Sequence, residues 1–173
     1  TNINMQLVAE NDPVLHQPTK PFVFSEHNAD KIVNEMAQIM FEEHGIGLAG
    51  PQVGFPYSVF VMKWMDDSAI GIFNPVITKL DENTEKFTEG CLSFPYIALN
   101  VTRPSTCTVS FTTSEEKIIS AELTGIHARC FLHEYDHLQG INFQKHVSNL
   151  QLDIAKRKRN KILKKIKRHA NNK

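Results

Sequence analysis

The sequence predicts a single α+β domain in which a mostly antiparallel sheet packs around a central helix, with further helices near both ends of the chain. Three observations carry this prediction. The chain has 173 residues, an ordinary size for one domain. Its β-prone segments are grouped between residues 57 and 123. Its helical patterns flank this group instead of alternating with it, which favours α+β over a parallel α/β sheet.

The elements follow from local patterns. Residues 28–43 place apolar side chains at helical spacing behind polar starters, which predicts an amphipathic helix that ends near Gly45. Short β-prone runs separated by turn signals then predict strands at 57–64, 71–80, 99–113 and 117–123. A second helix is predicted over 126–139, with Gly140 as its stop, and a third over 152–168.

Composition excludes several classes of protein. Apolar residues make up 41% of the chain and charged residues 22%, which is typical of a globular domain and argues against disorder. The longest apolar runs, such as 59–62, are far shorter than the ~20 residues of a membrane span. Three cysteines are too few for a disulfide scaffold, and no secretory signal is visible. We therefore expect a soluble protein of a reducing compartment.

The net charge of zero hides a strong asymmetry. After residue 150 there are ten Lys or Arg and one Asp, a formal charge of +9, so residues 1–150 carry −9. We therefore expect residues 1–150 to form the body of the domain, and residues 151–173 to extend it as a basic helical tail that can bind a polyanion.

The central helix carries a metal-binding pattern. His133-Glu134-Tyr135-Asp136-His137 is H-E-x-x-H, whose i, i+4 spacing puts two imidazoles on one helix face. Glu134 can then reach a metal-bound water without ligating the ion. The competing interpretation is a pair of surface histidines with a salt-bridging Glu between them.

A third ligand decides between classes of metal enzyme. The metzincin pattern requires His at position 143, where this chain has Phe143, so that extension fails. The upstream candidates are Cys91, Glu89, Cys107, His127 and Cys130. Cys91 stands out because Gly90 before it lets the backbone approach closely, whereas Cys107 and Cys130 are interpreted as small buried apolar residues.

The segment Gly45-Ile46-Gly47-Leu48-Ala49-Gly50 satisfies the dinucleotide pattern G-x-G-x-x-G. That pattern must follow a strand and open a helix, whereas this segment follows a helix and runs into Pro51. Dinucleotide binding is therefore disfavoured. The glycines instead offer backbone that a substrate can approach, and Gln52 supplies an amide donor.

Three segments together, 45–54 (GIGLAGPQVG), 89–95 (EGCLSFP) and 133–140 (HEYDHLQG), resemble the signature motifs of peptide deformylases in order and spacing. The resemblance implies that Cys91, His133 and His137 bind one divalent metal, with Fe(II) as the usual ion and Zn(II), Ni(II) or Co(II) able to replace it. It implies removal of formyl groups from formyl-methionyl nascent peptides, with release of formate. With it we expect residues 1–150 to be the catalytic domain, and the protein to be a monomer of a reducing, bacterial-type cytoplasm.

The resemblance also assigns roles in the reaction. Glu134 would be general base and then general acid, and the Gln52 amide and the Leu92 N–H would stabilise the oxyanion. For the substrate we expect contacts with the Gly47 backbone and with Glu89. The wall of an apolar side-chain pocket is expected at three further residues, Ile46, Ile126 and Cys130.

Two alternatives remain open. A zincin-like metallopeptidase would cleave internal peptide bonds, and a silent module would bind RNA through its basic tail. In the tail, Leu152, Ala155, Ile162 and Ile166 form an apolar seam that Arg159 interrupts and Leu163 widens. We expect this helix to dock on the acidic body or to bind ribosomal RNA, since some bacterial deformylases resemble it in using a C-terminal helix at the ribosome. A solvated helix and a membrane-surface helix are the other interpretations.

Overall fold

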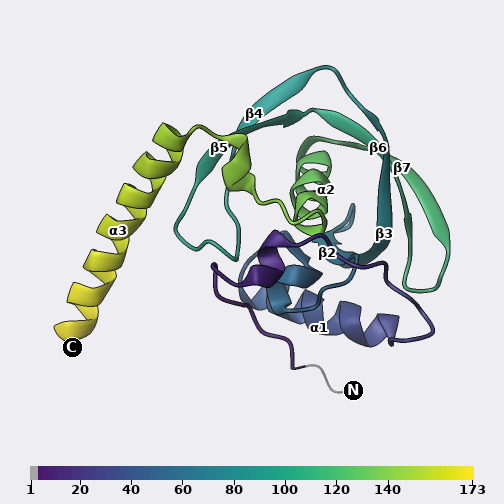
Figure 1. Ribbon diagram of the computed structural model, residues 1–173, viewed down its shortest axis with the longest axis horizontal. Coiled ribbons are helices and arrows are strands. Elements are labelled where there is room, and N and C mark those ends of the chain that lie inside the picture. Colours follow the sequence, from purple (N-terminus) through teal and green to yellow (C-terminus); the bar gives the residue numbers. More distant parts are fainter. Residues whose placement is uncertain (1–3) are drawn as a thin grey trace.

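The structure, a computed structural model, describes residues 4–173 and has the α+β architecture that the sequence predicts (Figure 1). Its helices are α1 (Ala29–Glu42), α2 (Gly125–Leu138) and α3 (Asn149–Asn171), with three 3-10 turns, η1 (Pro13–His16), η2 (Gly50–Val53) and η3 (Phe143–His146). Its strands are β1 (Gly47–Ala49), β2 (Val59–Lys63), β3 (Ala69–Leu80), β4 (Thr84–Glu89), β5 (Leu99–Pro104), β6 (Thr106–Thr112) and β7 (Ile118–Thr124).

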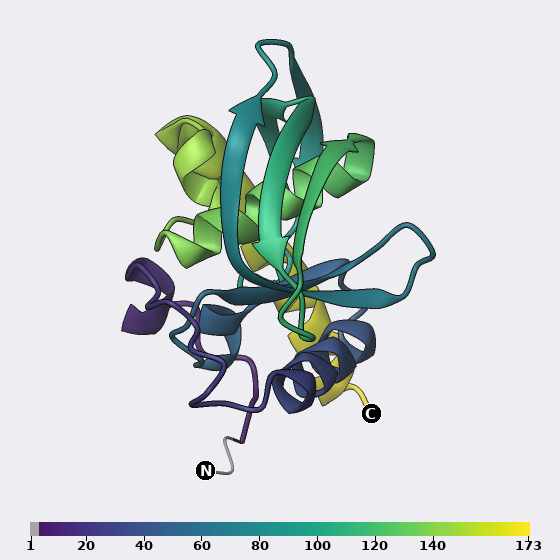
Figure 2. The same ribbon diagram turned by 90° about the vertical axis from the view of Figure 1, so that its right-hand side faces the viewer.

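The strands form two antiparallel sheets. Five strands pair in the order β1-β2-β3-β6-β7, and β4 pairs with β5 as a separate hairpin. Strand β3 serves two partners because its first half pairs with β2 and its second half with β6, with register shifts after Phe73 and after Ile77. Such bulges bend a strand. The sheet therefore turns and wraps around α2, which crosses behind the upright strands in Figure 2.

Helix α2 lies at the centre of the fold, as the sequence predicts (Figure 1). Phe131 and Ala128 of α2 are buried in a cluster with Phe60 and Met62 of β2. The alternate residues of β2, such as Val61, point the other way and join a second cluster under α1. Strand β2 is thus packed between two helices, and the sheet holds α2 from one side.

Most predicted elements are present, but the predicted strand 99–113 was wrong in its bounds, and strands β1 and β4 were missed. The run 99–113 is two strands, because Pro104 has no N–H to continue the ladder and Ser105 turns toward the β3–β4 connection, where its N–H donates to Asn83 O (3.0 Å). Strand β4 was not predicted. Five of its six residues are exposed, so it lacks the apolar alternation that marks a half-buried strand.

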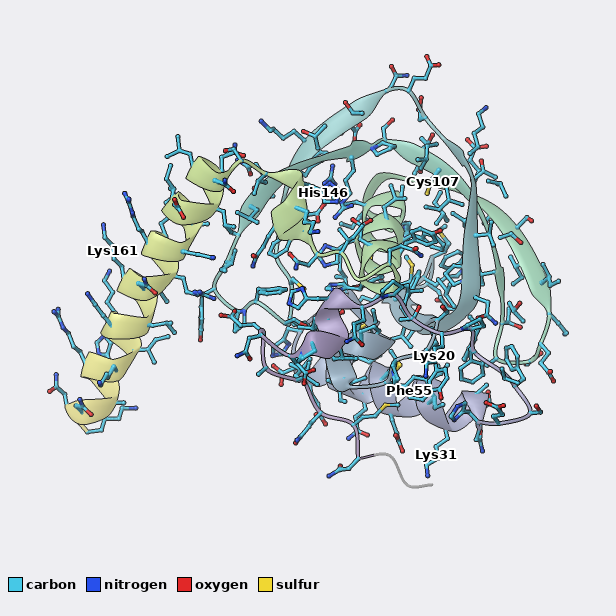
Figure 3. The ribbon with its side chains drawn as sticks, in the orientation of Figure 1. Lys20, Lys31, Phe55, Cys107, His146 and Lys161 are labelled. Carbon is cyan, nitrogen blue, oxygen red and sulfur yellow. The ribbon has the colours of Figure 1, made fainter. Side chains whose placement is uncertain are left out.

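Helix α3 is longer than predicted and only its first turns pack on the body. Ala155 is buried and Leu152 partly buried in a third cluster. Arg159 Nη1 donates to Glu10 Oε2 at 2.8 Å. Beyond that point the predicted seam is open, with Ile162 and Ile166 exposed at 39% and 45%. The helix then leaves the body, and Lys161 points away from it (Figure 3).

None of the helices in the described part of the chain combines the length and apolar character that a bilayer span requires.

Candidate metal centre

Helix α2 brings two histidines to the middle of the molecule. Gly125 starts the helix with φ +56°, a left-handed conformation that glycine adopts without strain. His133 and His137 lie one turn apart on the same face. His137 is fully buried, and the His133 side chain is 11% exposed. The interior of the fold, not the solvent, therefore surrounds both imidazoles, which argues against a pair of surface histidines.

Cys91 reaches these histidines from the β4–β5 hairpin. Strand β4 ends at Glu89, and Cys91 follows Gly90. The Cys91 Sγ atom lies 3.3 Å from Nε2 of His137. The ligand atoms of Cys91, His133 and His137 all lie within 4.8 Å of one another, and no other such group occurs among residues 4–173. The structure thus brings together the three predicted ligands and leaves the other upstream candidates out.

One thiolate and two imidazoles at these distances fit a divalent metal. Metal–sulfur bonds of about 2.3 Å and metal–nitrogen bonds of about 2.0–2.1 Å in a tetrahedral site place donors roughly 3.3–3.8 Å apart. The 3.3 Å between Cys91 Sγ and His137 Nε2 lies at the lower end of that range. Three protein ligands leave a fourth position for water or substrate, as in catalytic zinc sites.

Glu89 orients His133. The Nδ1 atom of His133 lies 2.8 Å from Glu89 Oε1, so its Nε2 is the nitrogen available to a metal. Arg103 donates two hydrogen bonds to the same carboxylate, from Nε to Oε2 at 2.7 Å and from Nη2 to Oε1 at 3.0 Å. Burial raises the pKa of Glu89, but hydrogen bonds from His133 and Arg103 outweigh it and lower the pKa to about 2. Glu89 is therefore a carboxylate at neutral pH.

Glu89 was predicted as a substrate contact, and the structure gives it other partners. It lines the pocket described below, but it is only 7% exposed and both of its oxygens accept hydrogen bonds from protein groups. The position of Glu89, two residues before the candidate ligand Cys91, could be read from the sequence. Its arginine partners could not, because they come from β5 and α2.

The surroundings shift the pKa values of the two histidines in opposite directions. Burial and the nearby His133 lower the pKa of His137 to about 3, so its ring stays neutral. Burial also lowers the pKa of His133, but hydrogen bonds with Cys91 and Glu89 outweigh it and raise the pKa to about 10. The anionic neighbours of His133 thus favour positive charge at this position, which a bound cation satisfies.

Glu134 lies beside the ligands. It is 2% exposed, and burial raises its pKa to about 7. Gly47 of β1 lies against it: a Cβ at Gly47 would be 2.8 Å from Glu134 Oε2 and 2.7 Å from Cys130 Sγ. Only glycine therefore fits at position 47. Because the pKa of Glu134 is near neutral, its carboxyl group can both accept and release a proton.

Gln52 points its amide nitrogen at the cysteine segment. The Ala49 N–H donates to Gln52 Oε1 at 2.9 Å, which fixes which end of the amide faces outward. Its Nε2 donates to Ser93 Oγ at 3.0 Å and lies 3.5 Å from Cys91 Sγ. Ser93 was not among the predicted site residues. The glycine-rich segment thus adds a fixed donor to the metal-ligand group.

One pocket of about 480 Å³, which we call the central pocket, joins these groups. Every predicted site residue except the buried His137 lines it: Ile46, Gly47, Gln52, Glu89, Cys91, Leu92, Ile126, Cys130, His133 and Glu134. Tyr96 and Arg129 also line it and were not predicted. Exposed apolar side chains of Ile46 (43%) and Ile126 (58%) mark its wall.

Known proteins are similar to this chain in sequence. The profile of the polypeptide deformylase family matches residues 4–153. The peptide deformylase of Thermotoga maritima is 34% identical over 157 residues, which cover 91% of this chain and 95% of that protein. The peptide deformylase of Brucella suis is 36% identical over 160 residues, with coverages of 90% and 91%.

Solved structures of peptide deformylases are similar to this structure as well. A peptide deformylase from Synechococcus elongatus, in complex with actinonin, superposes with a TM-score of 0.82 at 33% identity and covers 90% of this chain and 85% of its own. The plant peptide deformylase PDF1B reaches a TM-score of 0.84 at 30% identity, covering 99% of this chain and 95% of its own. With family profile, relatives and structures in agreement, this chain belongs to the polypeptide deformylase family.

Proposed function

We propose that the central pocket is where this protein, as a deformylase and hence a hydrolase, removes the N-terminal formyl group of nascent peptides. The observation that carries this assignment is the cluster of Cys91, His133 and His137 within 4.8 Å, with Glu134 beside it. The substrate class is formyl-methionyl peptides, and the products are formate and a free amino terminus.

Cys91 Sγ and one ring nitrogen each of His133 and His137 would hold one divalent ion. When bound, such an ion polarises the formyl oxygen and lowers the pKa of its water toward 7. We propose Fe(II) as the native ion, with Zn(II), Ni(II) or Co(II) as substitutes, since a thiolate and two imidazoles suit all four. Iron-loaded enzyme should lose activity in air while nickel-loaded enzyme keeps it; equal losses would contradict the iron assignment.

Glu134 would move the proton of the reaction. It accepts a proton from the attacking water as the new C–O bond forms at the formyl carbon. It then delivers that proton to the amine nitrogen as the C–N bond breaks. Its burial supports both steps, because burial raises the pKa of Glu134 to about 7 and brings its two protonation states close in free energy.

Two donors would stabilise the oxyanion of the tetrahedral intermediate. The Gln52 amide is fixed by Ala49 and points to the cysteine segment. The Leu92 backbone N–H has no acceptor among the described residues, which leaves it available to a substrate oxygen. Donors that are oriented before the reaction stabilise developing charge without reorganisation.

Strand β1 would bind the peptide backbone. It is the edge strand of the five-stranded sheet, so its outer edge is unpaired. An extended peptide can add to such an edge beside Gly47. The side chain that follows the formyl group would then enter the apolar part of the pocket, against Ile46, Ile126 and Cys130.

The test supplies formyl-Met-Ala-Ser under anaerobic conditions to enzyme loaded with Fe(II), Ni(II) or Zn(II) and measures formate. We expect formate from the formyl peptide with at least one ion. We expect no acetate from the matching acetylated peptide, because an acetyl group adds a methyl beside the buried ligands. Absence of formate with all three ions would overturn the assignment. Cleavage inside an unblocked peptide would favour the metallopeptidase alternative instead.

The tail supports a second, separate role. We propose that residues 1–150 act as the catalytic domain and that α3 extends it as an arm that binds ribosomal RNA. The arm is anchored by its first turns, and its outer half carries Lys161, Lys164 and Lys165 in solvent. Basic side chains free of acidic partners are suited to phosphate contacts. To act on nascent formylated chains, the protein would work as a monomer in a reducing, bacterial-type cytoplasm, where such chains occur.

A further inference from the structure

Arg129 is a buried arginine in the central pocket that the proposed reaction does not use. It lies on α2 one turn before His133 and is 8% exposed. Its Nη1 donates to Glu89 Oε2 at 2.5 Å and to Val101 O at 2.9 Å, and its Nη2 donates to Glu85 O at 2.7 Å. The guanidinium also lies 5.3 Å from the centre of the Phe87 ring. All of these partners belong to the β4–β5 hairpin.

These contacts join the two elements that carry the three ligands. His133 and His137 come from α2, whereas Cys91 follows the end of β4. Only Gly90 separates Cys91 from Glu89, so fixing Glu89 restricts the cysteine to within about 7 Å of it. The distance between the thiolate and the imidazoles therefore depends on how firmly the hairpin is held to the helix.

The hairpin has a second attachment further along α2. Arg103 of β5 donates to Asp136 Oδ2 at 2.9 Å as well as to Glu89. Arg129 and Asp136 are seven residues apart, or about 10 Å along the helix at 1.5 Å per residue. The hydrogen bond between Glu89 and His133 also joins the two elements, at the middle of this span. The attachments at Arg129 and Asp136, on either side of it, fix the angle of the hairpin relative to α2.

We propose that Arg129 is a positioning residue that holds the end of the β4–β5 hairpin, and with it Cys91, at metal-binding distance from the two histidines of α2. Its planar fork suits this task, because it reaches a carboxylate and two carbonyl oxygens of different strands at once. A lysine at this position keeps the charge but has one ammonium, which cannot span the three acceptors. This inference rests on the metal role proposed for Cys91.

The test uses full-length protein loaded with Co(II), whose thiolate charge-transfer absorption reports on the Cys91 bond and whose d–d bands report on the ion as a whole. The variants are Arg129→Met, which removes the charge and the fork, and Arg129→Lys, which removes the fork alone. Lys86→Met is the matched control, because it removes an exposed cation from the same hairpin without removing a contact to α2.

We expect Arg129→Met and Arg129→Lys to bind Co(II) about 10-fold more weakly in chelator competition, the lower end of the range for residues that support ligands. Both should show weaker thiolate absorption per bound ion, while Lys86→Met matches the wild type. Wild-type affinity and absorption in Arg129→Met, or full recovery in Arg129→Lys, would overturn the positioning role. If Arg129→Met does not fold, Arg129→Lys carries the test.

The same data separate this inference from the metal site itself. Wild-type protein should show the thiolate absorption, and Cys91→Ser should abolish it. If the wild type binds Co(II) without that absorption, the ligand role of Cys91 fails and the role of Arg129 fails with it. If the wild type shows it and both Arg129 variants keep it unchanged, only the role of Arg129 fails.

Discussion

The Oε1 atom of Glu134 lies 4.0 Å from Nε2 of His133, the nitrogen that faces away from Glu89. The carboxylate therefore sits next to the ligand group and is 2% exposed. Its other oxygen lies at Gly47, on the edge strand where the substrate is proposed to bind. Glu134 thus lies between the three proposed metal ligands and the edge strand, the place that the proposed proton transfer between water and a leaving amine requires.

Glu134→Gln should keep its metal and lose most of its activity. The amide has nearly the volume of the carboxyl group but cannot accept the proton from water, and general acid–base groups contribute about 10²–10⁴-fold to rate. Formate release should fall by that factor while the metal content per chain is unchanged. Glu122→Gln, at an exposed position of β7, is the control. Activity close to the wild type would remove Glu134 from the mechanism.

Gln52→Leu should lower kcat about 100-fold with a small change in KM, because a donor aimed at the oxyanion acts on the transition state more than on the bound substrate. The variant also leaves the Ala49 N–H without its acceptor, so we expect a lower melting temperature. Gln38→Leu, at an exposed position of α1, is the control for both measurements. A change in KM alone would contradict the oxyanion role.

Cys91→Ser should weaken metal binding by more than about 100-fold, since losses of supporting residues alone cost 10–100-fold. Chelator competition measures the affinity directly. Cys107→Ser is the control, because Cys107 is buried in β6 outside the ligand group, and burial raises the pKa of its thiol to about 11. Equal losses in the two variants would indicate a general loss of structure instead of a lost ligand.

Removal of residues 161–173 should weaken ribosome binding strongly and leave turnover of a free formyl peptide unchanged. This cut keeps Ala155 and the Arg159–Glu10 ion pair, which anchor α3, and removes six of the ten cations of the tail, all of them exposed. Cosedimentation with ribosomes should weaken with salt in the full-length protein, because phosphate contacts release counterions.

The control for the tail removes cations from the body instead. Lys79, Lys86 and Lys117, all exposed on strands or their connections, replaced together by Ala should leave cosedimentation unchanged. If this triple variant and the truncated protein bind ribosomes equally well, the tail has no part in binding.

The local signals in the sequence predicted the helices well, and they singled out the three candidate ligands that the structure brings together. His133 and His137 share a helix, so their spacing alone placed them on one face, and α1 began and ended close to its predicted limits. Cys91 was harder because its approach to α2 depends on a hairpin whose first strand, β4, has an exposed and charged pattern. No local rule joins residues that are 46 positions apart, as Cys91 and His137 are.

The residues that support the site were missed for the same physical reason. Arg103 and Arg129 have the side chains of ordinary surface residues, and arginine is almost never fully buried unless it is paired. Their partners, Glu89 and Asp136, are distant in sequence. In the tail, the apolar seam that the spacing predicts extends further than the docked face: contact ends near Arg159, and Ile162 and Ile166 stay exposed.

Strand β2 sets a limit on how this enzyme can vary. Val59, Phe60, Val61 and Met62 are all fully buried, because odd positions pack under α1 and even positions pack against α2. Strand β6 differs, since its buried and half-buried positions alternate. In a library of all single substitutions, β2 should therefore form an unbroken block of intolerant positions, whereas β6 should accept polar replacements at every second one. Substitutions that change binding at the central pocket should then be found among the residues that line it and not in β2, none of whose residues line the pocket.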